Sequence, residues 1–84
     1  MMAQDDLHNL LEYLAKSIVN NPEDVSVEEY VSGKTVHLDL RVHPEDIGRV
    51  IGKHGRVANS IRSILRVVAA RNGKQVDMDV VDLS

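Results

Sequence analysis

The residues best suited to chemistry lie in segment 50–61, VIGKHGRVANSI, where two glycines enclose a lysine and a histidine. Gly52 and Gly55 can adopt positive φ and leave no Cβ between the main chain and a ligand. Helical apolar spacing precedes and follows the glycines, so one helix is expected to end here and another to begin. The second helix then presents N–H groups and the positive end of its dipole. With Lys53 and His54, these groups predict a site for the phosphates of a sugar-phosphate backbone.

The charge distribution supports an anion site in the same part of the chain. The chain has 84 residues and a net charge of −3, but residues 47–76 hold seven of its ten basic side chains and none of its thirteen acidic ones. Those seven are Arg49, Lys53, Arg56, Arg62, Arg66, Arg71 and Lys74. Such asymmetry indicates a local surface for an anionic partner. The plainer alternative is a solvated basic helix face, because GxxG alone is a weak signal.

Other kinds of site find little support in the residue pattern. A nucleotide-binding P-loop needs GxxxxGK followed by Ser or Thr, but Gly48 lies one residue too close to Gly52, and His54 takes the position of the hydroxyl. The chain has no cysteine, and its four histidines match no zinc-binding spacing. The expectation is a protein with no catalytic residues, no metal and no cofactor, and therefore not an enzyme.

Hydrophobic periodicity outlines the elements that come before the loop. A helical repeat over residues 7–18 should end at Asn20-Asn21-Pro22. Two alternating runs, 25–31 and 36–42, predict a β-hairpin with its turn at Ser32-Gly33-Lys34.

The elements around and after the loop are predicted in the same way. The stretch His43-Pro44-Glu45-Asp46 has the residues of a helix start, so a short helix should run from there to Gly52. A second helix should run from about Arg56 to Arg71 and stop at Asn72-Gly73. Its expected apolar stripe is Val57, Ile61, Ile64, Leu65 and Val68. Alternation over residues 75–80 predicts the last strand.

The order α-β-β-α-α-β predicts one α+β domain spanning residues 1–84, with a three-stranded mixed sheet and three helices on one face. The last two strands are expected to be parallel, joined by a right-handed crossover. The other sheet face should carry four acidic residues and only one basic residue, so phosphate is expected to avoid it. Its predicted residues are Ser26, Glu28, Tyr30, His37, Asp39, Arg41, Asp77 and Asp79.

An apolar groove is expected beside the loop, against the second strand, where bases would lie by van der Waals contact and edge hydrogen bonds. The predicted binding residues of loop and groove together are Ile47, Arg49, Val50, Ile51, Gly52, Lys53, His54, Gly55, Arg56, Val57 and Ile61.

These residues carry a resemblance to a known family. Val50-Ile51 before GxxG and Ile61 after it resemble the hallmark of a K-homology (KH) domain, in the prokaryotic, type II order of elements. The stretch DIGRVIGKHGRVANSIRSILRVVAARNG closely resembles the KhpA family of small bacterial KH proteins. The resemblance implies a protein that binds single-stranded RNA, with the loop clamping the backbone of about four nucleotides.

The same resemblance implies partners and a cellular setting. KhpA-like proteins pair with a second KH protein, KhpB or Jag, and act as RNA chaperones and post-transcriptional regulators linked to cell shape and to cell-envelope and peptidoglycan homeostasis. A homodimer is the other expected assembly. The competing class is a protein-interaction module, a KH-fold dimerisation partner with little RNA binding of its own. The acidic N-terminus is unlike a signal peptide and no apolar run reaches membrane-spanning length, so the expected location is the cytoplasm without a membrane partner.

Overall fold

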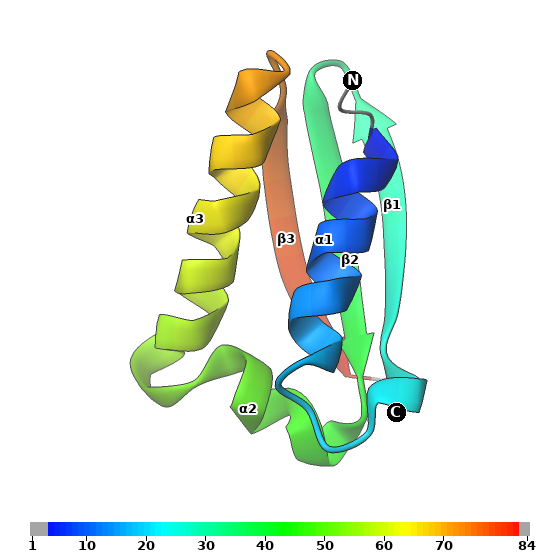
Figure 1. Cartoon of the computed structure of the whole chain (residues 1–84), viewed down its shortest axis with the longest axis vertical. Helices are drawn as coiled ribbons and strands as arrows, with labels where there is room; N and C mark the ends of the chain where they lie inside the picture. The colour runs from blue at the N-terminus through cyan, green and yellow to red at the C-terminus, as the bar shows by residue number, and fades with distance from the viewer. Residues whose placement is uncertain (1–3, 83–84) are drawn as a thin grey trace.

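The fold is described for residues 4–82 of a computed structural model of the chain (Figure 1). In chain order its elements are α1 (Gln4–Lys16), β1 (Ser26–Ser32), β2 (Thr35–Val42), α2 (Ile47–Ile51), α3 (Arg56–Arg71) and β3 (Gln75–Asp82), with 3-10 turns at Pro22–Asp24, Pro44–Asp46 and Lys53–Gly55. This order confirms the α-β-β-α-α-β arrangement that the hydrophobic periodicity predicts.

The three strands form one mixed sheet in the order β1-β2-β3. Strand β1 pairs with β2 in antiparallel fashion, with Val27 opposite Leu40, and β2 pairs with β3 in parallel fashion, with Leu38 opposite Met78. The hairpin turn is tight because Gly33 has φ 61°, in the left-handed region that glycine adopts at little cost. The predicted hairpin and the predicted parallel pairing are both confirmed.

The helices lie on one face of the sheet, with α1 and α3 along the strands and α2 across one end (Figure 1). The core between the two layers is aliphatic, and its largest fully buried side chains include Leu11, Leu38, Leu40, Leu65, Val36, Val42 and Val50. The predicted α+β fold, a three-stranded mixed sheet with three helices, is therefore confirmed. The fold places the loop of residues 52–55 at the end of the molecule where α2 meets α3.

Two details of the helices differ from the sequence prediction. Helix α1 ends at Lys16, so Ile18 lies beyond it and keeps 39% of its surface exposed. In α3, Ile64 is 43% exposed although the predicted stripe includes it. The buried side of α3 contains two alanines, whose small side chains let the helix axis approach the sheet; its residues are Ala58, Ile61, Leu65 and Ala69.

The opposite face of the sheet is polar. Tyr30 and His37 stack across β1 and β2 with ring centroids 4.7 Å apart. Arg41 donates a hydrogen bond of 2.7 Å to the Glu28 carboxylate, so the one basic side chain predicted for this face is paired. Asp39 lies opposite both Glu28 and Asp79 in the register. This placement agrees with the predicted acidic face.

Candidate nucleic-acid interface

Gly52 ends α2 in a conformation that excludes a side chain. Its N–H donates to the Gly48 carbonyl over 2.8 Å, and its φ of 75° lies in the left-handed region. A Cβ at this position would lie 2.4 Å from Cγ2 of Val57. The first glycine of the loop is therefore required by packing against α3 as well as by its backbone angles.

His54, which lies between the two glycines, also adopts a positive φ, although the sequence predicts this only for the glycines. His54 has φ 58° and Gly55 has φ 74°, so two successive residues are left-handed. The Gly55 N–H donates to the Gly52 carbonyl over 3.1 Å, which closes the loop into one tight turn. The N-cap residue of α3 is Gly55, which has no side chain to cap the first turn of the helix. The main chain of the loop thus forms one tight turn at the positive end of the α3 dipole.

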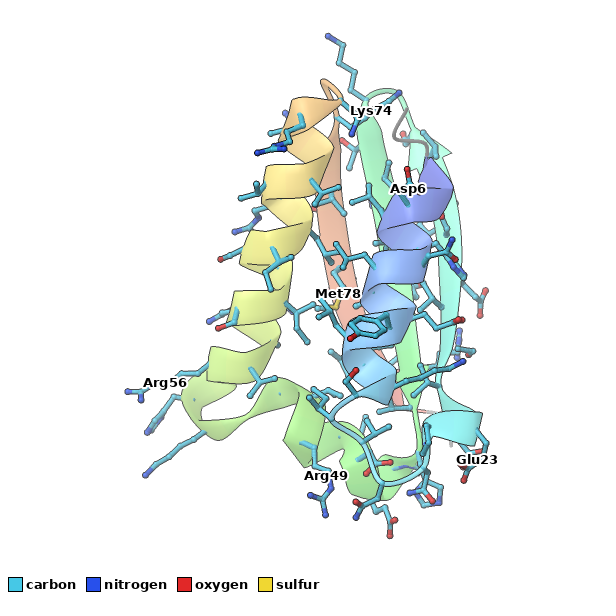
Figure 2. The ribbon with its side chains drawn as sticks, in the orientation of Figure 1. Asp6, Glu23, Arg49, Arg56, Lys74 and Met78 are labelled. Atoms are coloured by element: carbon cyan, nitrogen blue, oxygen red, sulfur yellow. The ribbon has the colours of Figure 1, made fainter. Side chains whose placement is uncertain are left out.

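The side chains at the loop are cationic and exposed. Lys53, His54 and Arg56 are all exposed to solvent. Figure 2 shows Arg56 projecting away from the body of the protein, while Arg49 projects from α2 in a different direction. Arg49 lies 3.3 Å from the Asp46 carboxylate, so its charge is partly compensated. The cations directly available to a phosphate on the loop are therefore Lys53 and Arg56.

The predicted apolar residues beside the loop are only partly accessible. Val50 is fully buried and Ile61 is 5% exposed, whereas Ile51 is 37% exposed. Ile47 and Val57 are half-buried. The expectation that Val50 lines an open groove is wrong, because this side chain belongs to the core beneath the loop.

The expected groove against the second strand is also wrong. Strand β2 is the middle strand, and its inward side chains, Val36, Leu38, Leu40 and Val42, are all buried under the helices. The strand that α2 and α3 both contact is β3, which is an edge strand. Sequence alternation identifies strands but does not say which of them lies under a given helix.

An apolar hollow does exist, on the other side of α3. It measures about 280 Å³ and lies between the C-terminal end of α1 and the first turns of α3. Its lining residues are Leu14, Ile18, Arg56, Val57, Ser60, Ile61 and Ile64. Of the predicted groove residues, only Val57 and Ile61 line this hollow.

Asp46 holds two segments of the chain together, a role beyond that of the helix-start acid that the sequence predicts. Its carboxylate is fully buried and accepts hydrogen bonds of 3.0 Å from the backbone N–H groups of Asn20 and Asn21. The Asn21 side chain donates a third bond of 3.0 Å. Burial raises the pKa of Asp46, but these hydrogen bonds and the Arg49 guanidinium lower it, and the net result is a pKa below its ordinary value. Asp46 thus ties the connection after α1 to the start of α2.

A polar contact joins α3 to the free edge of β3. Arg62 donates from Nε to the Met78 carbonyl over 3.0 Å and from Nη1 to Oδ1 of Asn59 over 3.0 Å. Sequence reasoning counts Arg62 as a basic residue but gives it no place in the site, and it omits Asn59. The i, i+3 spacing of the two residues is the only signal in the sequence that would have paired them.

A two-layer α+β fold with a GxxG turn between two helices, on the helical side of a three-stranded sheet, defines a KH domain. Comparison with protein families agrees, since the family model described as "KhpA/KhpB, KH domain" matches residues 8–80. The chain belongs to this family.

Curated relatives cover almost the whole chain. A protein of Halalkalibacterium halodurans is 40% identical over 90% of this chain and all of its own length. One of Clostridium perfringens is 41% identical over 89% of this chain and all of its own length, and one of Streptomyces coelicolor is 44% identical over 92% of this chain and 94% of its own. Each is named "RNA-binding protein KhpA".

A membrane-spanning helix is not found among the residues that the structure describes, because none of its helices is both long and apolar enough.

Proposed function

We propose that this chain is a single-stranded RNA-binding protein that holds the sugar-phosphate backbone against the loop of residues 52–55. The names of its relatives, which match along nearly their entire length, support RNA as the ligand. The observation that carries the proposal is the loop itself, with left-handed residues at 52, 54 and 55 beside an uncapped helix start. A tight turn of this kind lets a phosphate approach the main chain closely, and the exposed side chains of Lys53 and Arg56 flank the turn in the sequence.

The composition of the surface suggests weak and tolerant binding by one copy. The chain has two tyrosines and no Phe or Trp, and neither tyrosine belongs to the loop: Tyr13 is exposed on α1, and Tyr30 lies on the acidic sheet face, stacked on His37. Base stacking on aromatic rings contributes about 1–3 kcal/mol per base where it occurs. Without it, affinity depends on phosphate contacts and on shape, and a second RNA-binding copy or partner raises the overall affinity through effective concentration.

The test is a double variant, Lys53→Asp with His54→Asp, measured by fluorescence anisotropy with a single-stranded RNA oligomer. Asp tolerates the left-handed backbone of residue 54 better than most residues, so the fold should be kept. Affinity should fall about ten-fold to a hundred-fold, because a hydrogen bond to a charged group contributes about 1.5–3 kcal/mol.

The matched control is Ser32→Asp with Lys34→Asp, which makes the same change of charge at the hairpin turn, remote from the loop. It should retain most of the affinity of the parent. The clamp is contradicted if both double variants lose the same affinity for RNA. It is also contradicted if the loop variant keeps the affinity of the parent at an unchanged melting temperature.

The finer cellular role rests on the resemblance to the KhpA family. We propose that the chain acts as an RNA chaperone and post-transcriptional regulator, paired with a second KH protein of the KhpB or Jag kind, in cell-shape and peptidoglycan homeostasis. We place this pairing on the α1–α3 side, where the hollow opens; because Arg56 lines the hollow, a partner there would lie beside the loop.

The same hollow supports a second candidate function, a protein-interaction module. Ile64 and Ile18 both line this hollow and are 43% and 39% exposed, so the hollow presents accessible apolar surface that a partner could cover. Retention on immobilised single-stranded RNA that decreases with salt distinguishes the two candidates. A pure interaction module would not be retained.

A further inference from the structure

The side of α3 that faces β3 holds a fixed pair of polar side chains. Arg62 is half-buried, and its Nε–H donates to the Met78 carbonyl over 3.0 Å. Its Nη1 donates to Oδ1 of Asn59 over 3.0 Å. Because Met78 lies in the edge strand β3, these contacts hold the guanidinium along the seam between α3 and the sheet. Arg62 therefore presents its remaining N–H groups from a defined position rather than from a mobile side chain.

The contact with Arg62 also fixes the orientation of the Asn59 amide. A guanidinium only donates hydrogen bonds, so the atom of Asn59 that faces it must be the carbonyl oxygen. The amide nitrogen, Nδ2, consequently points the other way, toward the loop, and lies 3.8 Å from the place where a Cβ of Gly55 would be. Among the residues that the structure describes, none accepts a hydrogen bond from Nδ2.

The result is a small surface on which the groups of this pair without a protein partner are donors, because Oδ1 of Asn59 already accepts from Arg62. The donors are the two N–H bonds of Asn59 Nδ2 together with the Nη2 group and the second Nη1 proton of Arg62. Asn59 follows Gly55 by about one helical turn, or about 5.4 Å along the axis. A nucleotide whose phosphate lies on the loop can therefore place its base beside this pair.

We propose that Asn59 and Arg62 select the base next to the clamped phosphate, favouring bases that present two adjacent acceptors. Guanine does so with N7 and O6, and cytosine does so with N3 and O2. Adenine places its N6 amine beside the acceptor on both its Watson–Crick and its Hoogsteen edge, so a donor-only surface disfavours it. This inference rests on the proposed function, since it assigns a specificity to the same RNA-binding surface.

The experiment compares single-stranded RNA octamers of cytosine and of adenine by fluorescence anisotropy at one salt concentration. The parent should bind the cytosine octamer at least about five-fold more tightly, which corresponds to the lower end of the discrimination of about 1–3 kcal/mol for a good base contact. An adenine octamer with one central guanine should regain part of the difference.

The diagnostic variant is Asn59→Asp, which is nearly isosteric. It keeps an oxygen toward Arg62 and replaces the outward donors by an acceptor. An acidic residue in the first turns of a helix is favourable, so the fold should be maintained, and the melting temperature verifies this. The cytosine-to-adenine preference should fall to about one. Ser63→Asp adds the same charge one turn further along α3 and controls for electrostatic repulsion, which lowers both affinities equally and leaves their ratio unchanged.

The outcomes separate this inference from the proposed function. A ratio that collapses in Asn59→Asp and persists in Ser63→Asp supports base selection by the pair. If the parent binds both octamers and Asn59→Asp does not change the ratio of the two affinities, base selection is overturned but RNA binding stands. The pair would then act on phosphate or on the helix alone. Failure of the parent to bind either octamer overturns the proposed function and base selection together.

Discussion

The carboxylate of Asp46 connects parts of the chain that are distant in sequence. It accepts backbone hydrogen bonds from Asn20 and Asn21, after α1, and it contacts Arg49 within α2. Because α2 leads directly into the loop at Gly52, this buried anion fixes where the loop begins. No buried side-chain nitrogen or oxygen among the described residues lacks a partner, so the buried carboxylate oxygens of Asp46 are hydrogen-bonded.

The lowered pKa of Asp46 predicts a dependence of stability on pH. Its folded pKa lies below the unfolded value, so the ionised form stabilises the fold. This contribution is complete above the unfolded pKa of about 4 and is lost as the pH falls through the folded pKa. Asp46→Asn should therefore melt below the parent at pH 7, and the difference in melting temperature should narrow as the pH falls below about 4.

The control for this titration is Asp79→Asn, on the exposed sheet face, which should change the melting temperature little at any pH. A difference between Asp46→Asn and the parent that stays constant from pH 7 to pH 3 would contradict the role of the ionised carboxylate. Thermal denaturation followed by circular dichroism at several pH values gives the comparison.

At the scale of single residues, the sequence predicted what depends on local chemistry. Gly52 and Gly55 are recognisable because only glycine adopts a positive φ at little cost, and both do. The positive φ of His54 and the burial of Asp46 were not predictable, because the surrounding fold imposes them. Only the folded chain brings Asn20 and Asn21 to the Asp46 carboxylate.

At the scale of elements, α3 has two chemically different flanks above its buried side. One flank carries Asn59 and Arg62 and faces β3. The other carries Val57 and Ile64 and faces the hollow beside α1. RNA and a protein partner can therefore use the same helix from opposite sides, which reconciles the two candidate functions.

The apolar flank predicts association through the hollow. Ile64→Glu should abolish self-association, because burying an unpaired carboxylate in an apolar contact is costly. Sedimentation velocity at several protein concentrations should show a reversible dimer for the parent and a monomer for the variant. Ala70→Glu, exposed near the other end of α3, serves as the matched control and should still associate. A parent that stays monomeric at every concentration contradicts self-pairing.

The elements themselves were largely predictable, whereas their contacts were not. Alternation and helical spacing gave the order of the elements and the bounds of α3, because period and turn residues are local properties. The order of strands in the sheet is not visible in the sequence. The sequence therefore predicts a groove against β2, whereas the strand beneath α3 is β3. Apolar spacing predicts Ile64 in the core, because the sequence does not show that α1 ends before it could cover this side chain. In the fold Ile64 lines the hollow instead.

At the scale of the whole molecule, the fold separates its charges. The seven basic residues of segment 47–76 belong to α2, the loop, α3 and the turn after it, while Glu28, Asp39, Asp77 and Asp79 lie on β-strands and point to the opposite face. The net charge of −3 therefore hides a cationic surface along the loop and α3, although α1 on the same side is acidic. A polyanion is attracted by the local potential of that surface and repelled by the sheet face.

This separation predicts how RNA binding responds to salt. If Lys53, Arg56 and one or two further cations meet phosphates, the logarithm of affinity should fall against the logarithm of salt concentration with a slope of roughly −2 to −3, from about −0.7 per phosphate for single strands. Arg56→Gln should make the slope shallower by about 0.7 and weaken binding to all sequences similarly. Asp79→Lys, on the sheet face, should leave slope and affinity nearly unchanged although it alters the net charge more. A flat slope in the parent would contradict binding through phosphate contacts. A larger effect from Asp79→Lys than from Arg56→Gln would place the RNA on the sheet face, because contacts at the loop and α3 predict the larger effect for Arg56→Gln.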